Sequence, residues 1–320
     1  MYMNLLRHIY RIIFLFFIGL CGMTSCTAFE EDLPECRLFV KFKYDYNLLS
    51  VDAFHTQVDK VELYVFDKAG KFLFSQIEEG DPLASGNYLM KVELPIGEYQ
   101  FLAWAGARDS YDIAPLTKGT STIAEVKLKL KREQSLIIDK HLEPLWYGEI
   151  IDVDFNGTAN KTVIVNLIKD TNIARFVFEN RGASNFDVNK YTYELTESNG
   201  YLDYDNTLIA DDMLSCQPYH IEQSSATTGI IELNTMRLMT DRLNRFTVKD
   251  KTTGATVFKV DLTDFFLQLR LEEYKDKWGD QEYFDRKDSY DVVFYLSGST
   301  NPWLSVSVIL NGWTWYIQSE

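Results

Sequence analysis

The chain has 320 residues, enough for two ordinary domains, and its 47 acidic and 32 basic side chains give a net charge of −15. A strongly acidic surface repels phosphate backbones and anionic headgroups, so nucleic acid is excluded as a partner, and so is membrane contact through a basic patch. The aromatic residues, 14% of the chain, mostly alternate with polar residues, which favours core packing in strands over sugar stacking.

The first predicted element is a lipoprotein signal peptide at residues 1–25. Arg7 and Arg11, with no acid among them, precede the apolar run "IIFLFFIGLCGM". A basic start followed by an apolar core of about 7–15 residues is typical of a secretory signal. A spanning helix needs about 20 apolar residues, so this run is too short to cross a membrane. The sequence therefore predicts export.

Cys26 directly follows Met23, Thr24 and Ser25. This order of apolar, small, small and cysteine resembles a bacterial lipobox, although leucine is more usual than Met23. In a lipobox the thiol is alkylated by diacylglycerol, and cleavage makes the cysteine the new N-terminus. A disulfide and a free thiol are the alternatives for Cys26. Lipidation would add diacylglycerol and an N-acyl chain such as palmitate, and two or more chains give stable attachment. No other cofactor is expected.

Residues 26–35 form a predicted acidic tether that contains Glu30, Glu31 and Asp32. These acids fit a solvated linker. They also resemble the acidic export signal of surface lipoproteins in Bacteroides-type bacteria. The expected location is therefore the outer membrane, with the protein exposed at the cell surface.

Residues 36–169 show strand periodicity. In "RLFVKFKYDY" the even-numbered apolar residues from Leu38 to Tyr46 face one way, and "EYQFLAWAG" places Tyr99, Phe101 and Ala103 on one face. A hairpin turn is predicted at residues 68–70. Alternation bounded by turn residues predicts half-buried antiparallel strands.

Residues 170–320 repeat this pattern after a change of unit near "IKDTN". One stretch differs, because Leu262, Phe265, Phe266 and Leu269 recur at helical spacing and predict a short helix. Many short strands separated by turns predict β-sandwiches. The prediction is an all-β protein with one sandwich at 36–169 and another, which includes the short helix, at 170–320.

Sites for chemistry are absent from the sequence patterns. The histidines after the signal are isolated, and no zinc, nucleophile or phosphate-loop motif occurs. Asp203 and Asp205 lie in an acidic stretch, but Leu208 replaces the glycine that a calcium loop needs. Cys36 and Cys216 are either bridged or two buried free thiols. We therefore predict no catalytic residue, no metal site, no small-molecule substrate and no enzyme.

Several stretches together resemble the FimB-like fimbrium anchoring subunits of Bacteroides-type (type V) pili. They are "DAFHTQVDKVELYVFDKAGKF", "GEYQFLAWAG", "LIKDTNIARFVF" and "QEYFDRKDSYDVVFYLSG", and with "FKYDYN" they cover most of Lys41 to Gly298. The resemblance implies two tandem transthyretin-like β-sandwich domains without catalysis. It also implies a role at the base of a fimbrium, where the protein fixes the fibre to the outer membrane and limits its length.

Fimbrial subunits of this kind join by strand complementation, so the resemblance implies a shaft subunit as partner. In the C-terminal "NGWTWYIQSE", Trp313, Trp315 and Ile317 project to one face and are candidates for a donated strand. The alternative is that this segment is the last strand of the second sandwich, paired within its own chain. Two other functions stay open: a surface glycan-binding lipoprotein, which predicts an exposed aromatic platform, and a fimbrial tip adhesin.

Overall fold

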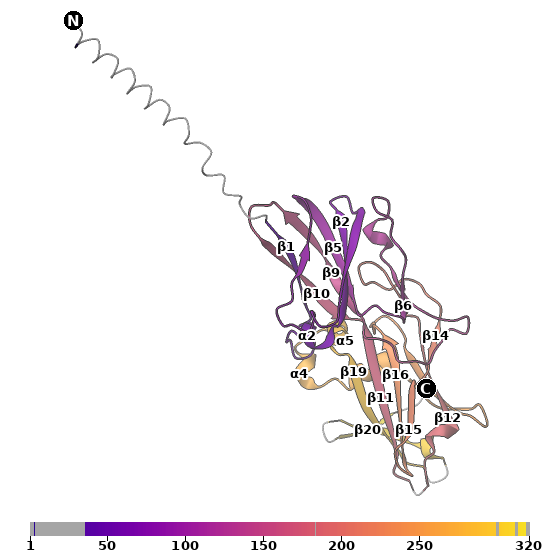
Figure 1. Cartoon of the computed structure of the whole chain (residues 1–320). Coiled ribbons are helices and arrows are strands. Elements are labelled where there is room, and N and C mark those ends of the chain that lie inside the picture. The colour runs from indigo at the N-terminus through magenta and orange to yellow at the C-terminus, as the bar shows by residue number, and fades with distance from the viewer. Residues whose placement is uncertain (1–2, 4–35, 183, 299–300, 311–312, 318–320) are drawn as a thin grey trace. The chain divides into compact units, whose positions relative to one another are not determined.

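The computed structural model describes residues 3, 36–182, 184–298, 301–310 and 313–317 (Figure 1). The chain separates into two units, Met1–Cys36 and Arg37–Glu320, and strands β1 to β21 all belong to the second unit. Within the described residues, no helix has the length and apolar character needed to cross a membrane.

The N-terminal half of this unit is built on a sheet in the order β3-β2-β5-β9-β10-β1-β4. Parallel pairing joins β1 to β10, whereas the other neighbours are antiparallel. Its strands are β1 (Leu38–Lys43), β2 (Lys60–Asp67), β3 (Phe72–Glu79), β4 (Met90–Val92), β5 (Gly97–Ala105), β9 (Trp146–Phe155) and β10 (Lys161–Lys169).

The alternation in the sequence determines which faces of these strands are buried. In β1, Leu38, Val40 and Phe42 are buried, and the residues between them are only partly so. The predicted hairpin between β2 and β3 is confirmed. Gly70 adopts a φ of 72° there and donates its N–H to the carbonyl of Asp67 at 2.9 Å, a conformation that costs glycine little.

Strand β5 differs from the half-buried prediction because both of its faces are covered. Phe101 and Ala103 are buried as expected, but so are Leu102 and Trp104 on the other face. Leu102 and Trp104 belong to the large apolar cluster that also takes in side chains from residues 126–145. The long connection after β5 therefore returns over the sheet as a second layer.

The C-terminal half contains two sheets that pack face to face. Their orders are β15-β16-β11-β19-β20-β21 and β18-β17-β12-β14-β8. The strands are β11 (Thr171–Asn180), β12 (Tyr191–Glu197), β14 (Leu214–Cys216), β15 (His220–Gln223), β16 (Thr228–Met236), β17 (Arg245–Asp250), β18 (Thr256–Asp261), β19 (Ser289–Leu296), β20 (Val306–Leu310) and β21 (Trp313–Ile317), with β8 (Ile137–Ile138) supplied by the N-terminal half.

Aromatic contacts join the two sheets. Phe176 of β11 meets Phe246 of β17 edge to face, with ring centroids 4.9 Å apart. Phe258 of β18 meets Phe294 of β19 in the same way at 5.5 Å. Such pairs contribute beyond the area they bury. Packed sheets of short strands confirm the predicted all-β sandwich class.

Short strands from one half complete sheets in the other. Strand β8 pairs in parallel with β14, and a small sheet joins β6 (Tyr111–Ile113) and β7 (Leu128–Leu130) to β13 (Tyr201–Leu202). The chain passes from the seven-stranded sheet to the six-stranded sheet at Asp170, between β10 and β11. The apolar cluster, however, contains side chains from both halves. The boundary at 169/170 stays a prediction.

The predicted helix is confirmed as α3, and Asp261 caps it by accepting a hydrogen bond from the N–H of Asp264 at 3.2 Å. Helix α3 spans Leu262–Gln268. The other helices were not predicted: α2 (Phe54–Gln57) and α4 (Glu272–Lys275) span four residues each, and α5 (Asp280–Arg286) spans seven. The 3-10 turns are η1 (Ile123–Glu125), η2 (Val188–Lys190) and η3 (Pro302–Leu304).

Candidate functional site

The predicted lipid site is not among the residues that the structure describes. Cys26 and the acidic tether around it fall within residues 4–35. Lipid attachment at Cys26 therefore stays a prediction.

Cys36 and Cys216 are both free thiols. Cys216 is buried at the end of β14, and its Sγ donates to Oε1 of Glu197 at 3.3 Å. Burial raises the pKa of this thiol well above its ordinary value, and the neighbouring carboxylate adds to the shift. Cys216 is therefore a packed core residue rather than a reactive one.

Glu197 is a fully buried carboxyl group on β12 that the sequence patterns did not single out. It accepts hydrogen bonds from the Oγ1 of Thr235 and, at 3.3 Å, from the backbone N–H of Met236. Burial raises the pKa of Glu197 to about 7, and these hydrogen bonds offset part of the effect. The described residues that hydrogen-bond to this carboxyl group are Cys216, Thr235 and Met236, and none of them carries a positive charge.

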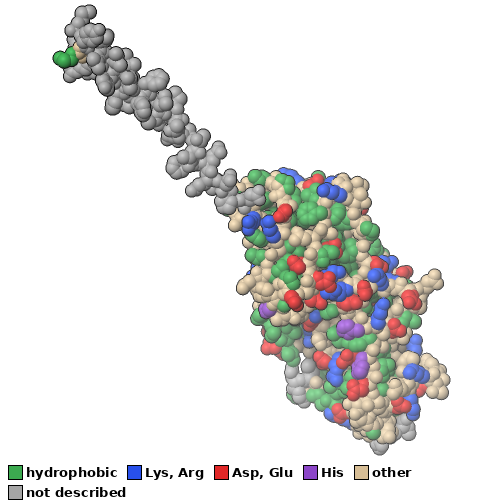
Figure 2. All heavy atoms as spheres, in the orientation of Figure 1, with side chains coloured by type: hydrophobic (Ala, Val, Ile, Leu, Met, Phe, Trp, Pro, Cys, Tyr) green, Lys and Arg blue, Asp and Glu red, His purple; other side chains and the backbone are tan. Residues whose placement is uncertain are grey.

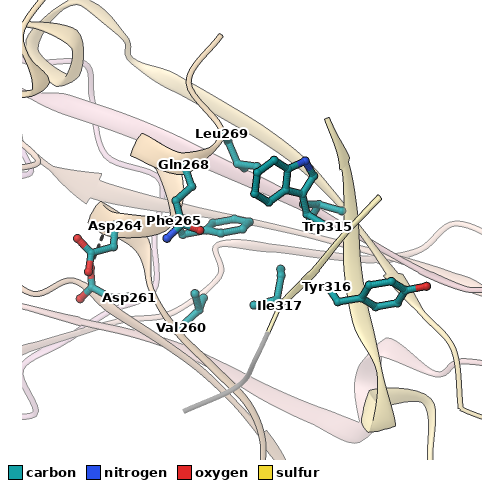
Figure 3. A pocket seen from close by; sticks show the side chains of 10 residues that line it. Val260, Asp261, Asp264, Phe265, Gln268, Leu269, Trp315, Tyr316 and Ile317 are labelled. Atoms are coloured by element: carbon teal, nitrogen blue, oxygen red, sulfur yellow. Dashed lines mark hydrogen bonds between the residues drawn. The ribbon is translucent and has the colours of Figure 1, made fainter. Parts of the chain in front are cut away.

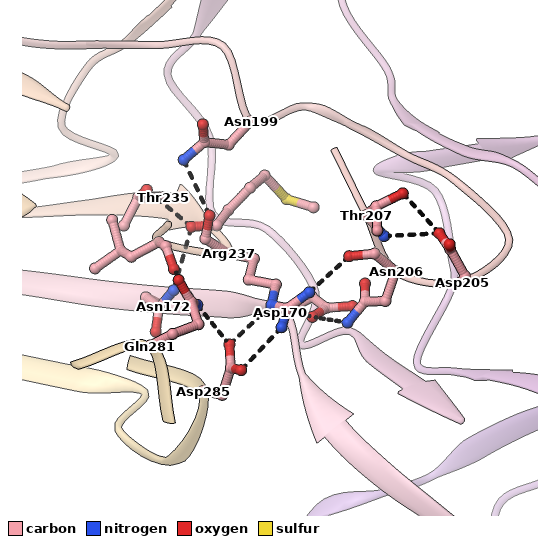
Figure 4. A network of polar contacts seen from close by, with 12 residues as sticks. Asp170, Asn172, Asn199, Asp205, Asn206, Thr207, Thr235, Arg237, Gln281 and Asp285 are labelled. Carbon is pink, nitrogen blue, oxygen red and sulfur yellow. Dashed lines mark hydrogen bonds and ion pairs between the residues drawn. The ribbon is translucent and has the colours of Figure 1, made fainter. Parts of the chain in front are cut away.

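A second buried polar network lies where β10 leads into β11 (Figure 4). Arg237 donates to both carboxylate oxygens of Asp285 at 2.8 Å, and its Nε lies 4.0 Å from Oδ1 of Asp170. Asn206 donates to the same Asp170 oxygen at 3.0 Å. Burial raises the pKa of Asp170 to about 7, an effect that Arg237 partly offsets.

This network fastens four separate segments together: the start of β11, the loop after β13, the end of β16 and helix α5. A bidentate guanidinium–carboxylate pair is directional, and removing one partner of a buried pair is costly. We interpret the network as structural, because Arg237 bonds to Asp285 and Asn206 bonds to Asp170, although Oδ2 of Asp170 and Oδ1 of Asn206 have no hydrogen-bond partner among the described residues. Across the described residues, no group of three or more His, Cys, Asp or Glu side chains is placed to hold a metal ion.

The predicted donor residues lie on the hairpin formed by β20 and β21, which we call the terminal arm. Every residue of β21 pairs with β20, from Val306 opposite Ile317 to Leu310 opposite Trp313. Strand β20 itself pairs with β19 only at Tyr295 and Leu296. The terminal arm is therefore hydrogen-bonded to its sheet at one end only, although Val306 and Val308 of β20 are packed into the core.

The three candidate residues do share a face, as predicted. That face is the core side, because residues opposite each other in an antiparallel ladder point the same way and Ile317 lies opposite buried Val306. Nevertheless Trp313 is 75% exposed and Trp315 is 54% exposed. The inner face of the terminal arm is therefore incompletely covered.

Trp315 borders a groove of about 370 Å³, which accounts for its exposure. Trp315 and Ile317 line one wall, and the opposite wall is made by the end of β18 and by α3 (Figure 3). Figure 3 also shows Tyr316 pointing away from the other labelled side chains. Polar groups at the groove are Asp261, Asp264 and Gln268.

Charge is distributed without a single dominant patch on the face drawn in Figure 2, where acidic and basic side chains are interspersed over the folded unit.

The sequence matches a family model described as fimbrillin-A associated anchor proteins Mfa1 and Mfa2, over residues 33–319. It is 22% identical, over 301 residues, to the minor fimbrium anchoring subunit Mfa2 of Porphyromonas gingivalis, with 91% of this chain and 90% of that protein covered.

Two solved structures have the same fold as this chain. A Bacteroides thetaiotaomicron protein, provisionally described as polysaccharide-binding, is 55% identical with a TM-score of 0.81, covering 89% of this chain and 99% of that one. The fimbrial anchor protein Mfa2 of P. gingivalis shares the fold, with a TM-score of 0.68, 20% identity and coverage of 89% and 100%.

Proposed function

Because the chain belongs to the family of fimbrillin-A associated anchor proteins, whose model spans residues 33–319, we propose that it fixes the base of a fimbrium to the outer membrane and limits the length of the fibre. The family consists of anchoring subunits rather than enzymes. The buried carboxyl groups of Glu197 and Asp285 accept hydrogen bonds from Thr235 and Arg237, within the networks described above. The observation that carries the proposal is the family match over nearly the whole folded unit.

Membrane attachment is proposed to be covalent, through diacylglycerol and an N-acyl chain on Cys26. The support is the lipobox-like sequence before Cys26 and the acidic tether between it and β1. Strand β1 begins at Leu38, soon after the tether, so proteolytic removal of this strand would separate the folded unit from its lipid. The first strand is therefore expected to stay in place.

Attachment to the shaft subunit is proposed to use strand complementation at the terminal arm. Support comes from the exposed inner face of β21 and from the short pairing between β20 and β19. Two modes stay open. The strand carrying Trp313, Trp315 and Ile317 is either donated to the shaft subunit or kept in its own hairpin, where it forms part of the docking surface.

The experiment that tests the proposed function is immunogold labelling of intact fimbriae, with a deletion strain examined in parallel. Anchor function predicts label at the fibre base, and it predicts longer fibres that are shed into the medium when the gene is deleted. Label at the distal end would instead identify a tip adhesin.

A second candidate function is binding of surface glycans. It is favoured by the half-exposed ring of Trp315 beside Asp261, Asp264 and Gln268 of the groove, because stacking combined with polar side chains is a chemistry suited to sugars. The 55% identical relative carries a provisional description of the same kind. Titration of tryptophan fluorescence with purified polysaccharides would test it, and an unchanged spectrum would count against it.

A further inference from the structure

The outer edge of β19 is open over most of its length. On one side β19 pairs with β11 along its entire span, from Ser289 to Leu296. On the other side it pairs with β20 only at Tyr295 and Leu296. In the register that those two pairs set, the next hydrogen-bonded pair would join Val293 to Ile309, and it is not formed.

The direction of the backbone groups along β19 follows from its bonded residues. The carbonyl of Leu296 accepts from the N–H of Arg181 on the β11 side at 2.8 Å, whereas the N–H of Ser297 donates to Ser305 on the β20 side at 3.0 Å. Successive residues of a strand point their N–H and C=O groups to opposite sides. Odd-numbered residues of β19 therefore point these groups outward.

Asp291 and Val293 accordingly present their N–H and C=O groups to the open edge, and no described residue pairs with them there. Both residues line a groove of about 280 Å³. The groove is otherwise largely apolar, and its walls include Phe266, Leu269, Tyr274, Tyr283, Val308 and Ile309. A free edge beside apolar walls is the arrangement that binds an added strand through main-chain hydrogen bonds and alternate side chains.

The charge in the groove restricts what fits there. Lys287 lines it, and within the described part of the chain its amine makes no ion pair; it lies 5.1 Å from the ring of Tyr290. Burial lowers the pKa of this amine, although Asp288 and Asp291 act in the opposite direction. An acidic side chain on an incoming segment would give Lys287 the partner that it lacks.

We propose that the open edge of β19 accepts an extended segment of the fimbrial shaft subunit, which adds to the sheet as a strand with apolar residues at alternate positions and an acid facing Lys287. The identity of the partner rests on the proposed function. The free stretch Ser289–Phe294 spans about 20 Å at strand rise, which suits a strand of ordinary length. This chain therefore receives a strand at β19, whether or not it also donates β21.

The test uses proline at an outward-facing position. Val293→Pro removes an N–H that points into the groove, and proline is tolerated where the N–H of an edge strand faces outward. The matched control is Lys259→Pro on β18. The N–H of Leu262 donates to Asn244 of the β17 side, so alternation points the N–H of Lys259 to the free edge of β18.

Each variant is expressed as the only copy of the full chain, and the amount of chain per shaft subunit is measured in purified fimbriae. We expect Val293→Pro to lower this ratio by about tenfold or more, the effect of losing a hydrogen bond and its register, and Lys259→Pro to leave it unchanged. A second variant, Ile309→Lys, places a charge in the groove without removing a core side chain, and we expect the same loss.

Three results would overturn the inference. The first is a wild-type ratio for both Val293→Pro and Ile309→Lys in folded protein. The second is an intrachain disulfide between cysteines at Val293→Cys and Ile309→Cys in fimbria-bound chain, because the terminal arm would then close the edge itself. The third is absence of the wild-type chain from purified fimbriae, which contradicts the proposed function and removes the partner with it. The first two results leave the anchor function intact, so the two failures can be told apart.

Discussion

Trp315 lies directly opposite Val308 in the ladder between β21 and β20, yet Trp315 is 54% exposed and Val308 is 3% exposed. Both side chains point to the core side of the sheet. Val308 is covered there, whereas Trp315 extends past the cover into the groove beside α3. The sandwich is thus incomplete at the strand that ends the chain.

Replacing Trp313, Trp315 and Ile317 together with serine tests whether this strand is donated. Donation predicts a folded, membrane-bound protein that no longer captures the shaft subunit, because each large apolar side chain that becomes buried contributes about 1.5–3 kcal/mol. Shaft capture in a pull-down and the melting temperature are the two measurements. Replacement of Thr314 and Tyr316 on the opposite face is the matched control.

Two outcomes decide against donation. A large drop in melting temperature would mean that the pairing of β21 with β20 stabilises this chain's own fold. Unchanged capture by a folded triple variant would mean that the shaft subunit does not use this strand.

Replacing Cys26 with alanine tests the lipid anchor. The thiol is the proposed attachment point for the acyl chains, so Cys26→Ala should move the protein from the membrane pellet to the soluble fraction. Cys36→Ala is the control and should stay in the pellet. A Cys26→Ala protein that still pellets with the outer membrane after a high-salt wash would contradict the proposal.

Replacing Glu197 with glutamine tests the buried carboxyl group. Its pKa is raised to about 7 in the folded protein by burial, against an ordinary value near 4.5. The folded state therefore binds the proton more tightly, and the wild-type free energy of unfolding should fall as the pH rises from about 4.5 through 7. Glu197→Gln removes this titration, so its stability should change less over that range.

Urea denaturation at several pH values measures this difference. Glu194→Gln, on the same strand but half-exposed, is the matched control for the loss of a carboxylate from β12. Parallel stability curves for wild type and Glu197→Gln between pH 5 and about 8 would contradict a buried carboxyl group that titrates in this range.

The proposed division at Asp170 is tested with fragments 36–169 and 170–320. Each is expected to unfold cooperatively but at lower denaturant than the intact chain, because β13 and β14 lose their partners β7 and β8. Circular dichroism during urea titration measures this. Two fragments that are both unfolded and aggregated would count against autonomous domains.

Features that repeat along a short stretch were predictable from the sequence. The alternation starting at Leu38 identified β1, the spacing from Leu262 to Leu269 identified α3, and the glycine at position 70 marked a hairpin. Each is a local pattern whose cause, one buried face or one positive φ, lies within a few residues.

Relationships between distant residues were not predictable in this way. Asp170, Arg237 and Asp285 form one network, although more than forty residues separate each from the next along the chain. Glu197 continues the buried alternation of Tyr191, Tyr193 and Leu195, but an acidic residue at that position does not read as part of a core. The exposure of Trp315 depends on the positions of the end of β18 and of α3, which border the same groove. The alternation within β21 predicted only that Trp313, Trp315 and Ile317 lie on one face.

The parallel pairing of β1 with β10 has a mechanical consequence. The tether enters at the start of β1, and β10 continues into β11 through the single residue Asp170. Tension between the tether and the C-terminal half would draw the two strands along their length in opposite directions. All six register pairs, from Leu38–Lys161 to Lys43–Asn166, would then carry load at once instead of parting one by one. A lipid-fixed end before β1 would therefore load the hydrogen bonds between β1 and β10 in shear. Paired strands resist separation best in that direction.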